Sequence, residues 1–357
     1  MKKLVLLAFA AISLSITGCD EDFEVAAPYK NITIVYAMLN HADSVHYIRI
    51  QKAFMDANKS AIDMAKVSDS SFYPEDALEV EIREIFPNGT VVTDPNLAYR
   101  VNMANENVVK EPGTFFTTPN YAYKYHKHLN KNNRYRIVIT NVLTGDVDSA
   151  ETAIISSDTT QGNFYVLAFG DYNYPPQTLA FRQTTAVGHK YKLPVNVTSP
   201  AKVVEGIIRF SYWEVDHINP DQHKFVDFPF ATAVVDNGSA TLETPNSAFY
   251  SFFRTALGEA PASVERFLDS QCVIDVYAGS EDYYTYRKIT ATQMSGITST
   301  EIKPIYTNMM GTDVYGLFTT RAVRHGINIP IDKVTVDSRA SNPVTLPTRL
   351  KDKFYGE

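Results

Sequence analysis

Short runs in which apolar and polar residues alternate recur along most of the chain. The clearest is residues 78–83, where every second residue is Leu, Val or Ile and the residues between them are charged. A period of two places the apolar side chains on one face of a strand. Strands are therefore predicted at residues 31–39, 44–54, 78–83, 90–92, 134–141, 149–156, 164–169, 178–181, 203–215, 231–235 and 273–277.

Helical patterns are few and short. Helices are predicted at residues 246–257, 263–268 and 280–294, and residues 56–71 could hold a short helix or a long loop. Ser280 is placed to cap the last of these helices, with two acidic residues in its first turn. The fold class predicted from these patterns is mainly β.

A polar stretch at residues 156–162 divides the strands into two groups. Strands of this length separated by turn residues predict a β-sandwich domain at 31–157. Residues 158–337 are predicted to form a second β-rich domain with a few short helices, and 338–357 a polar tail.

The first 19 residues have the pattern of a lipoprotein signal. Two lysines precede an apolar run that is too short to span a bilayer, and the run ends in Ile16-Thr17-Gly18-Cys19. This spacing predicts a signal peptide at 1–18, cleavage after Gly18, and lipid on Cys19 that holds the protein to a membrane. The alternative is an ordinary secretory signal with a chance cysteine.

An acidic run, Asp20 to Glu24, follows Cys19 in the predicted tether 19–30. It resembles the surface-export signal of lipoproteins in the phylum Bacteroidota, which implies the outer membrane and its outward face. The alternative is inner-membrane retention. The net charge of the full chain is −7 and no basic cluster is present, which argues against nucleic acid as a partner. Cys272 lies in an apolar stretch and is expected to be a buried small hydrophobe, with a catalytic thiol as the alternative. Because Cys19 carries the lipid, Cys272 has no partner for an internal disulfide.

Three patterns resemble a Bacteroidota family of outer-membrane lipoproteins of unknown function. They are Ile34–Leu39 followed by Tyr47–Phe54, then Cys272–Arg287, and Pro304–Asn308 followed by Gly316–Phe318. The resemblance implies an Ig-like N-terminal sandwich, a second β-rich domain, and a TonB-dependent receptor as a neighbour. The resemblance assigns no catalytic residue to this chain.

The densest cluster of ligand-type side chains comprises Glu214, Asp216, His217 and His223. Carboxylates and imidazoles are ligands for divalent metals, so these residues are weak candidates for a metal site. The alternative is a solvated hairpin end.

Tyr121, Tyr123 and Tyr125 alternate, so they share one face if the segment is a strand. As an exposed row they are candidates for ligand contact, and as a buried row they form a cross-strand ladder. A second group of tyrosines, in the predicted helix 280–294, is expected to pack that helix against the sheet.

No nucleophile, phosphate-loop, zinc-protease or dinucleotide motif occurs, so we predict no enzymatic activity and no cofactor. The leading hypothesis is a binding or accessory subunit at the outer membrane, whose ligand the sequence does not reveal. A fimbrillin-like adhesive subunit and an enzyme acting on surface polysaccharide or peptide are the alternatives. A C-terminal tail that completes another subunit's sheet would favour the adhesive subunit.

Overall fold

The computed structural model describes residues 32–53, 60–92, 96–158, 164–170, 175–181, 189–198, 200–295, 306–335, 350–351 and 354–356. The predicted signal peptide and tether, including Cys19, lie outside the described residues, as does most of the predicted tail. The strands are β1 (Thr33–Leu39), β2 (Val45–Lys52), β3 (Leu78–Ile85), β4 (Asn96–Asn102), β5 (Tyr121–His126), β6 (Arg134–Asn141), β7 (Val147–Ala153), β8 (Phe164–Val166), β9 (Lys190–Val197), β10 (Ala201–Asp216), β11 (Gln222–Val234), β12 (Ser239–Pro245), β13 (Val264–Ser280) and β14 (Val314–Pro330). The helices are α2 (Ala61–Ala65), α3 (Ser68–Ser71), α4 (Asn246–Leu257) and α5 (Glu281–Ser295), with 3-10 turns η1 (Met103–Glu106), η2 (Leu167–Phe169) and η3 (Lys333–Thr335).

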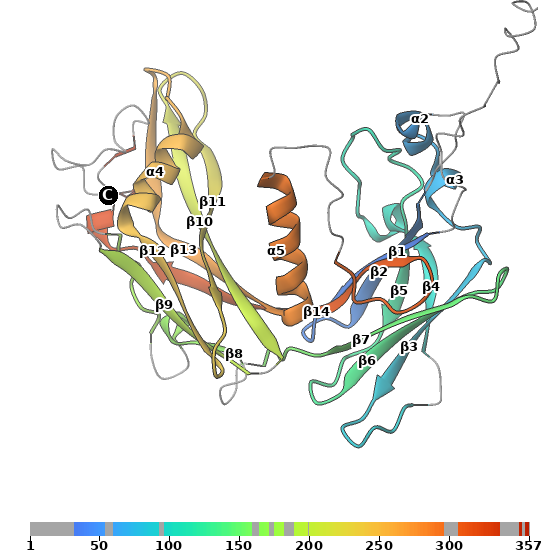
Figure 1. The fold of residues 1–357 in the computed structure, drawn as a ribbon. Helices are drawn as coiled ribbons and strands as arrows, with labels where there is room; N and C mark the ends of the chain where they lie inside the picture. The colour runs from blue at the N-terminus through green and yellow to red at the C-terminus, as the bar shows by residue number, and fades with distance from the viewer. Residues whose placement is uncertain are drawn as a thin grey trace, which may run out of the picture.

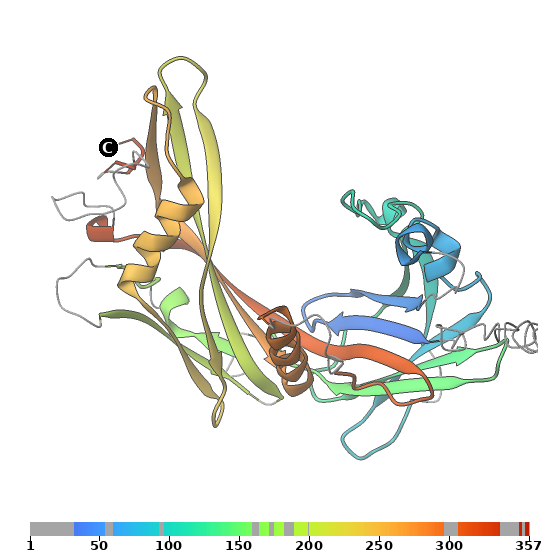
Figure 2. The same ribbon diagram turned by 45° about the horizontal axis from the view of Figure 1, so that its top comes forward.

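These elements form two lobes, with α5 standing between them (Figure 1). We call β1 to β7 with the first part of β14 the first lobe, and β8 to β13 with α4 and the rest of β14 the second lobe. A view from another side again places α5 between the lobes (Figure 2). The mainly β fold class is confirmed.

The first lobe is an Ig-like sandwich. Strands β1, β2 and β5 are neighbours in one part of the sheet, and β3, β6 and β7 are neighbours in the other. Strand β4 pairs with both β5 and β3, so it joins the two parts. This is the division of strands that defines the Ig sandwich, with the first, second and fifth strands opposite the third, sixth and seventh.

Strand β14 belongs to both lobes. Its residues 314–320 pair in parallel with β1, and its residues 321–330 pair antiparallel with β13. Met309, Val314 and Phe318 therefore lie in the core of the first lobe, although the predicted domain range 158–337 placed them in the second. Along the rest of the chain the two cores separate between Ile154 and Ile155, close to the predicted boundary.

The second lobe encloses an aromatic core. The sheet portion β11-β10-β13-β14 and the three-stranded sheet β12-β9-β8 contribute to one buried cluster, which α4 completes. Phe249 of α4 stacks on Phe181 with ring centroids 4.5 Å apart, and both side chains are fully buried. Helix α4 has the predicted bounds 246–257, and α5 follows the prediction within one residue at each end. The oxygen of Ser280 accepts from the backbone N–H of Tyr283, as expected for a cap.

The predicted helix at 263–268 is wrong, because this segment begins strand β13. Val264, Arg266 and Leu268 all point inward, so the period is two, but a charged residue occupies the middle core position. Arg266 tolerates burial because its guanidinium donates to Glu214 at 2.9 Å and to the carbonyl of Gly258 at 3.1 Å.

None of the described helices is long and apolar enough to cross a membrane.

Candidate functional site

The four candidate metal ligands do not converge. Burial alone would raise the pKa of Glu214, but hydrogen bonds from Lys224 and Arg266 lower it below its ordinary value. His223 stacks on Trp213 and bonds Asp269 at 2.9 Å. Within the described ranges, no group of three or more His, Cys, Asp or Glu side chains could hold a metal ion.

Asp216 accepts hydrogen bonds from the side chain of Asn219 at 2.7 Å and the backbone of Ile218 at 3.1 Å. The backbone N–H of His217 donates to the carbonyl of Ser263. These contacts close the turn between β10 and β11, so the solvated hairpin end is the better interpretation of this cluster.

The tyrosine row of β5 faces inward. Tyr123 is 6% exposed and Tyr125 is 1% exposed, so neither ring is presented to a ligand. Tyr121 is half-buried, with the guanidinium of Arg100 3.8 Å from its ring centroid and Phe72 packed against it. The prediction that these residues contact a ligand is therefore corrected: two of them form the buried ladder, because the opposite face of β5 is the one turned outward.

The tyrosine that anchors α5 is Tyr283. Its ring lies over Gly279, where a Cβ atom would come within 2.2 Å of it, and it packs with Val203 and Leu317. Its hydroxyl donates to Glu205 at 3.2 Å. The expectation that this helix packs on the sheet through a tyrosine is confirmed, and the anchor fixes α5 beside the outer face of β14 and β1.

An open hollow of about 430 Å³ lies between α5 and strands β1 and β2. We call it the aromatic groove. It is lined by Tyr36, Ala37, Met38, Asp43, Val45, His46, Tyr47, Tyr283, Tyr286 and Leu317. Its volume is within the range of small-molecule sites, and its four tyrosines supply both apolar surface and hydrogen-bonding groups.

Strand β1 forms the floor of the groove because both of its faces are apolar. Val35, Ala37 and Leu39 enter the core, which turns Tyr36 and Met38 outward, where they are 42% and 50% exposed. Burial first, and the neighbouring Tyr286 second, raise the pKa of Tyr36. The rings of these two tyrosines meet edge-on, with centroids 6.2 Å apart, and join the floor to the α5 wall.

The hydroxyl of Tyr47, one of the lining residues, is hydrogen-bonded to the segment around η1. Glu106 accepts hydrogen bonds from the hydroxyl of Tyr47 and the ammonium group of Lys124, both at 2.7 Å. The Lys124 contact is the main cause of the lowered pKa of Glu106, and the bond to Glu106 raises the pKa of Tyr47. Tyr47 is thus held with its hydroxyl directed to η1.

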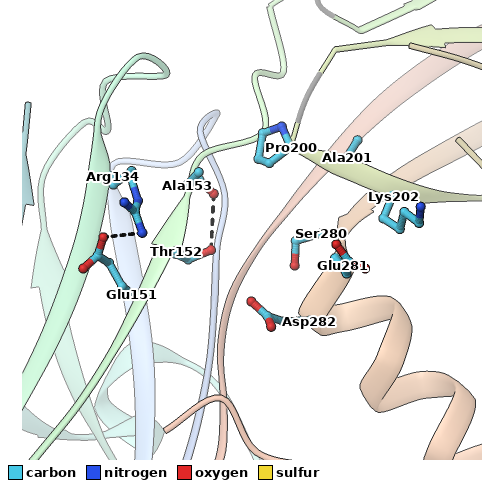
Figure 3. Close-up of a pocket in the computed structure, with 10 residues that line it drawn as sticks. All are labelled: Arg134, Glu151, Thr152, Ala153, Pro200, Ala201, Lys202, Ser280, Glu281 and Asp282. Atoms are coloured by element: carbon cyan, nitrogen blue, oxygen red, sulfur yellow. Dashed lines mark hydrogen bonds and ion pairs between the residues drawn. The ribbon is translucent and has the colours of Figure 1, made fainter. Parts of the chain in front are cut away.

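A second hollow, of about 380 Å³, lies between β7 and the starts of β10 and α5 (Figure 3). Its lining is polar, but two of its three carboxylates already have partners. Glu151 binds Arg134 at 2.5 Å and Arg136 at 2.7 Å, and Asp282 accepts from the hydroxyl of Tyr306. Carboxylates occupied in this way are poorly placed for acid–base work, so the aromatic groove is the stronger candidate site.

Tyr36, Met38 and Tyr47 were not among the site residues predicted from the sequence. The signal was present, since residues 34–39 are apolar at both odd and even positions. A strand with two apolar faces is either covered on both sides or leaves a face for binding.

No protein-family model matches the chain, and no curated protein matches its sequence. Solved structures similar to it include CBD12 from CALX1.2, with 13% sequence identity, 82% of this chain and 98% of that chain covered, and a TM-score of 0.18. The calcium binding domain CBD12 of CALX1.1 has 9% identity, coverage of 84% and 99%, and a TM-score of 0.17. The C-terminal globular domain of an oligosaccharyltransferase from Pyrococcus abyssi has 11% identity, coverage of 73% and 55%, and a TM-score of 0.19. At these TM-scores the likenesses carry no conclusion about this chain.

Proposed function

We propose that this protein is a non-enzymatic binding subunit of the outer membrane that takes a small ligand in the aromatic groove. The observation that carries the proposal is the groove itself, an open aromatic hollow between α5 and strands β1 and β2 of the first lobe, outside the two closed cores. An outward-facing Tyr and Met side by side on one strand form the kind of apolar surface that marks binding sites.

The location of the protein is proposed on sequence grounds. Lipid on Cys19 anchors the chain to the outer membrane, and the acidic run after it directs the protein to the cell surface. A TonB-dependent receptor is the proposed partner, as the family resemblance implies. In this arrangement the protein holds a ligand at the surface next to the receptor that imports it.

The anchor has a direct test. Cys19→Ala removes the only side chain in the predicted lipobox that can carry the lipid. We expect this variant to be released from the membrane fraction, while the wild type stays in it after a high-salt wash. Retention of the variant would contradict the lipid anchor.

The binding role is tested by purifying the tagged protein from gently solubilised outer membranes. Mass spectrometry then identifies both the co-purifying proteins and the small molecules released on denaturation. We expect a stoichiometric TonB-dependent receptor and an enriched small molecule with the wild type. The double variant Tyr36→Ser, Met38→Ser should lose the small molecule.

The matched control is Ile218→Ser, Phe225→Ser, which changes two exposed apolar side chains of the second lobe and should retain the small molecule. The same small molecules with both double variants would contradict binding in the groove. The protein recovered alone, without receptor or ligand, would contradict the role as a whole.

A further inference from the structure

Arg49 lies beside the aromatic groove, next to two of its lining residues. It lies on the outward face of β2, directly across from Tyr36 of β1 and two residues from Tyr47. Residues paired in this way have Cβ atoms about 5 Å apart. The base of the Arg49 side chain therefore lies next to the floor of the groove, and its guanidinium is directed to Asn120, just before β5.

The guanidinium of Arg49 is held by a neutral partner. One of its terminal nitrogens donates to Oδ1 of Asn120 at 2.5 Å, and Asn120 is itself only 5% exposed. The backbone N–H of Asn120 donates in turn to Oδ1 of Asn102. This arrangement fixes the direction of the Arg49 side chain while leaving its charge uncompensated.

A second cation lies near Arg49. The ammonium group of Lys110 donates to the carbonyl of Phe116 at 2.8 Å, and burial and then the neighbouring Arg49 lower its pKa. Within the part of the chain that the structure describes, no carboxylate pairs with Arg49 or Lys110. The nearby Glu106 is already bound by Tyr47 and Lys124.

Several other arginines on the strands of this protein have acidic partners, although Arg100 and Arg324, like Arg49, pair with no carboxylate among the described residues. Arg136 binds Glu151, Arg209 binds Asp227, and Arg266 binds Glu214. A partly buried guanidinium has lost some of its hydration, and this loss is offset when an anion pairs with it. Arg49 lacks that compensation, and it does so beside an aromatic groove.

We propose that Arg49 anchors a carboxylate of the ligand whose apolar or aromatic body lies in the aromatic groove. The proposal rests on the proposed function and adds the chemical class of its ligand. The planar fork of a guanidinium fits the two oxygens of a carboxylate, and the donors that Asn120 leaves free suffice for one such group. A phosphate, with more charge and more acceptor oxygens, is better served by a cluster of arginines or a helix N-terminus.

Two small probes that differ only in charge test this assignment. N-acetylphenylalanine carries a carboxylate beside an aromatic ring, and N-acetylphenylalanine amide carries the same ring without the charge. Binding of each to the full mature protein is measured by calorimetry. We expect the acid to bind roughly tenfold or more tightly than the amide, as a charge-assisted hydrogen bond allows.

Arg49→Gln should abolish this preference while leaving the affinity for the amide unchanged. Arg209→Gln, which removes an exposed and paired arginine of the second lobe, is the control and should keep the preference. Arg49→Lys keeps the charge but not the fork, and it replaces the glutamine variant if that variant does not fold. The lysine variant should retain only part of the preference.

The outcomes separate this proposal from the proposed function. Equal binding of acid and amide, with both lost in Tyr36→Ala, overturns the role of Arg49 and supports the groove. A preference for the acid that survives Arg49→Gln also overturns it, as does the absence of saturable binding of the acid. Tighter, Arg49-dependent binding of phenyl phosphate overturns the assignment to a carboxylate in favour of a phosphate.

Discussion

The two lobes stabilise their cores in different ways. The second lobe surrounds α4 with phenylalanine rings, such as Phe210 and Phe253 with centroids 5.1 Å apart. The first lobe buries carboxylates, and both of the buried carboxylates among the described residues, Glu84 and Asp148, lie there. Apolar packing contributes to stability at every pH, whereas buried carboxylates make stability depend on it. The first lobe, which carries the groove, is thus the lobe whose stability depends on pH.

The largest loss of stability is expected when an aromatic ring is removed from the core of the second lobe. Phe249→Ala should lower the free energy of unfolding by about 3–5 kcal/mol, because the ring is fully buried and contacts several other rings. Trp213 is the sole tryptophan and lies in this lobe, so its fluorescence in a urea titration reports the loss. Phe225→Ala, at a ring that is 57% exposed, is the control and should change little. Equal losses in the two variants would contradict an apolar basis for this lobe.

The next largest loss of stability is expected when Glu84 is replaced. Burial alone would raise the pKa of this carboxyl, but hydrogen bonds from Lys127, Asn133 and Tyr135 lower it. Glu84→Ala leaves these three donors without their acceptor and should cost the first lobe about 2–4 kcal/mol. Hydrogen exchange of β3 and β6 measures the loss, and Glu79→Ala, at an exposed position on the same strand, is the control.

The sequence predicted local structure better than which faces are buried. The bounds of α4 and the position of β3 followed from periodicity, which depends only on near neighbours. The tyrosines of β5 and the pair Tyr36 and Met38 of β1 look alike in sequence, because each row alternates along a strand. Only the packing of the two parts of the sandwich decides that Tyr125 is inside and Tyr36 outside.

The pairing of strands that are distant in the chain also could not be predicted from the sequence. Strand β14 was not predicted, and its parallel pairing with β1 joins the two ends of the described chain. Periodicity does not reveal which strand lies beside which. The groove depends on this pairing, because β14 carries Leu317 into the position where α5 packs beside β1.

The ionisation of Asp148 should make stability depend on pH in the opposite direction to that of Glu84. Burial is the main cause that raises its pKa from 3.8 to about 6, and one of its oxygens has no hydrogen-bond partner among the described residues. The folded state holds the proton more tightly than the unfolded state, so stability is lost as pH rises from about 4 to above 6. For Glu84, whose pKa is lowered, stability is lost as pH falls below the ordinary value.

Asp148→Asn removes the charge and should therefore stabilise the first lobe at neutral pH. A pKa difference of this size corresponds to at most about 3 kcal/mol, and we expect a gain of about 1–2 kcal/mol because the amide leaves a donor unpaired. Urea unfolding followed by tyrosine circular dichroism should show the gain at about pH 7.5 and little of it at about pH 4.5. The same gain at both pH values would show that the ionisation of Asp148 is not its cause.

A change in stability of similar size is expected at the seam between the lobes, where it changes the groove as well. Gly279→Ala places a methyl group where the ring of Tyr283 now lies, so the first turns of α5 must shift. We expect a loss of about 1–3 kcal/mol, as for overpacking elsewhere, and faster protease cleavage within α5. Gly113→Ala is the control, because no atom lies within 4 Å of its added Cβ atom. If cleavage of α5 were unchanged in Gly279→Ala, Tyr283 would not be the anchor of the helix. A faster rate together with weaker ligand binding would instead show that the α5 wall of the groove is held in place by this one ring.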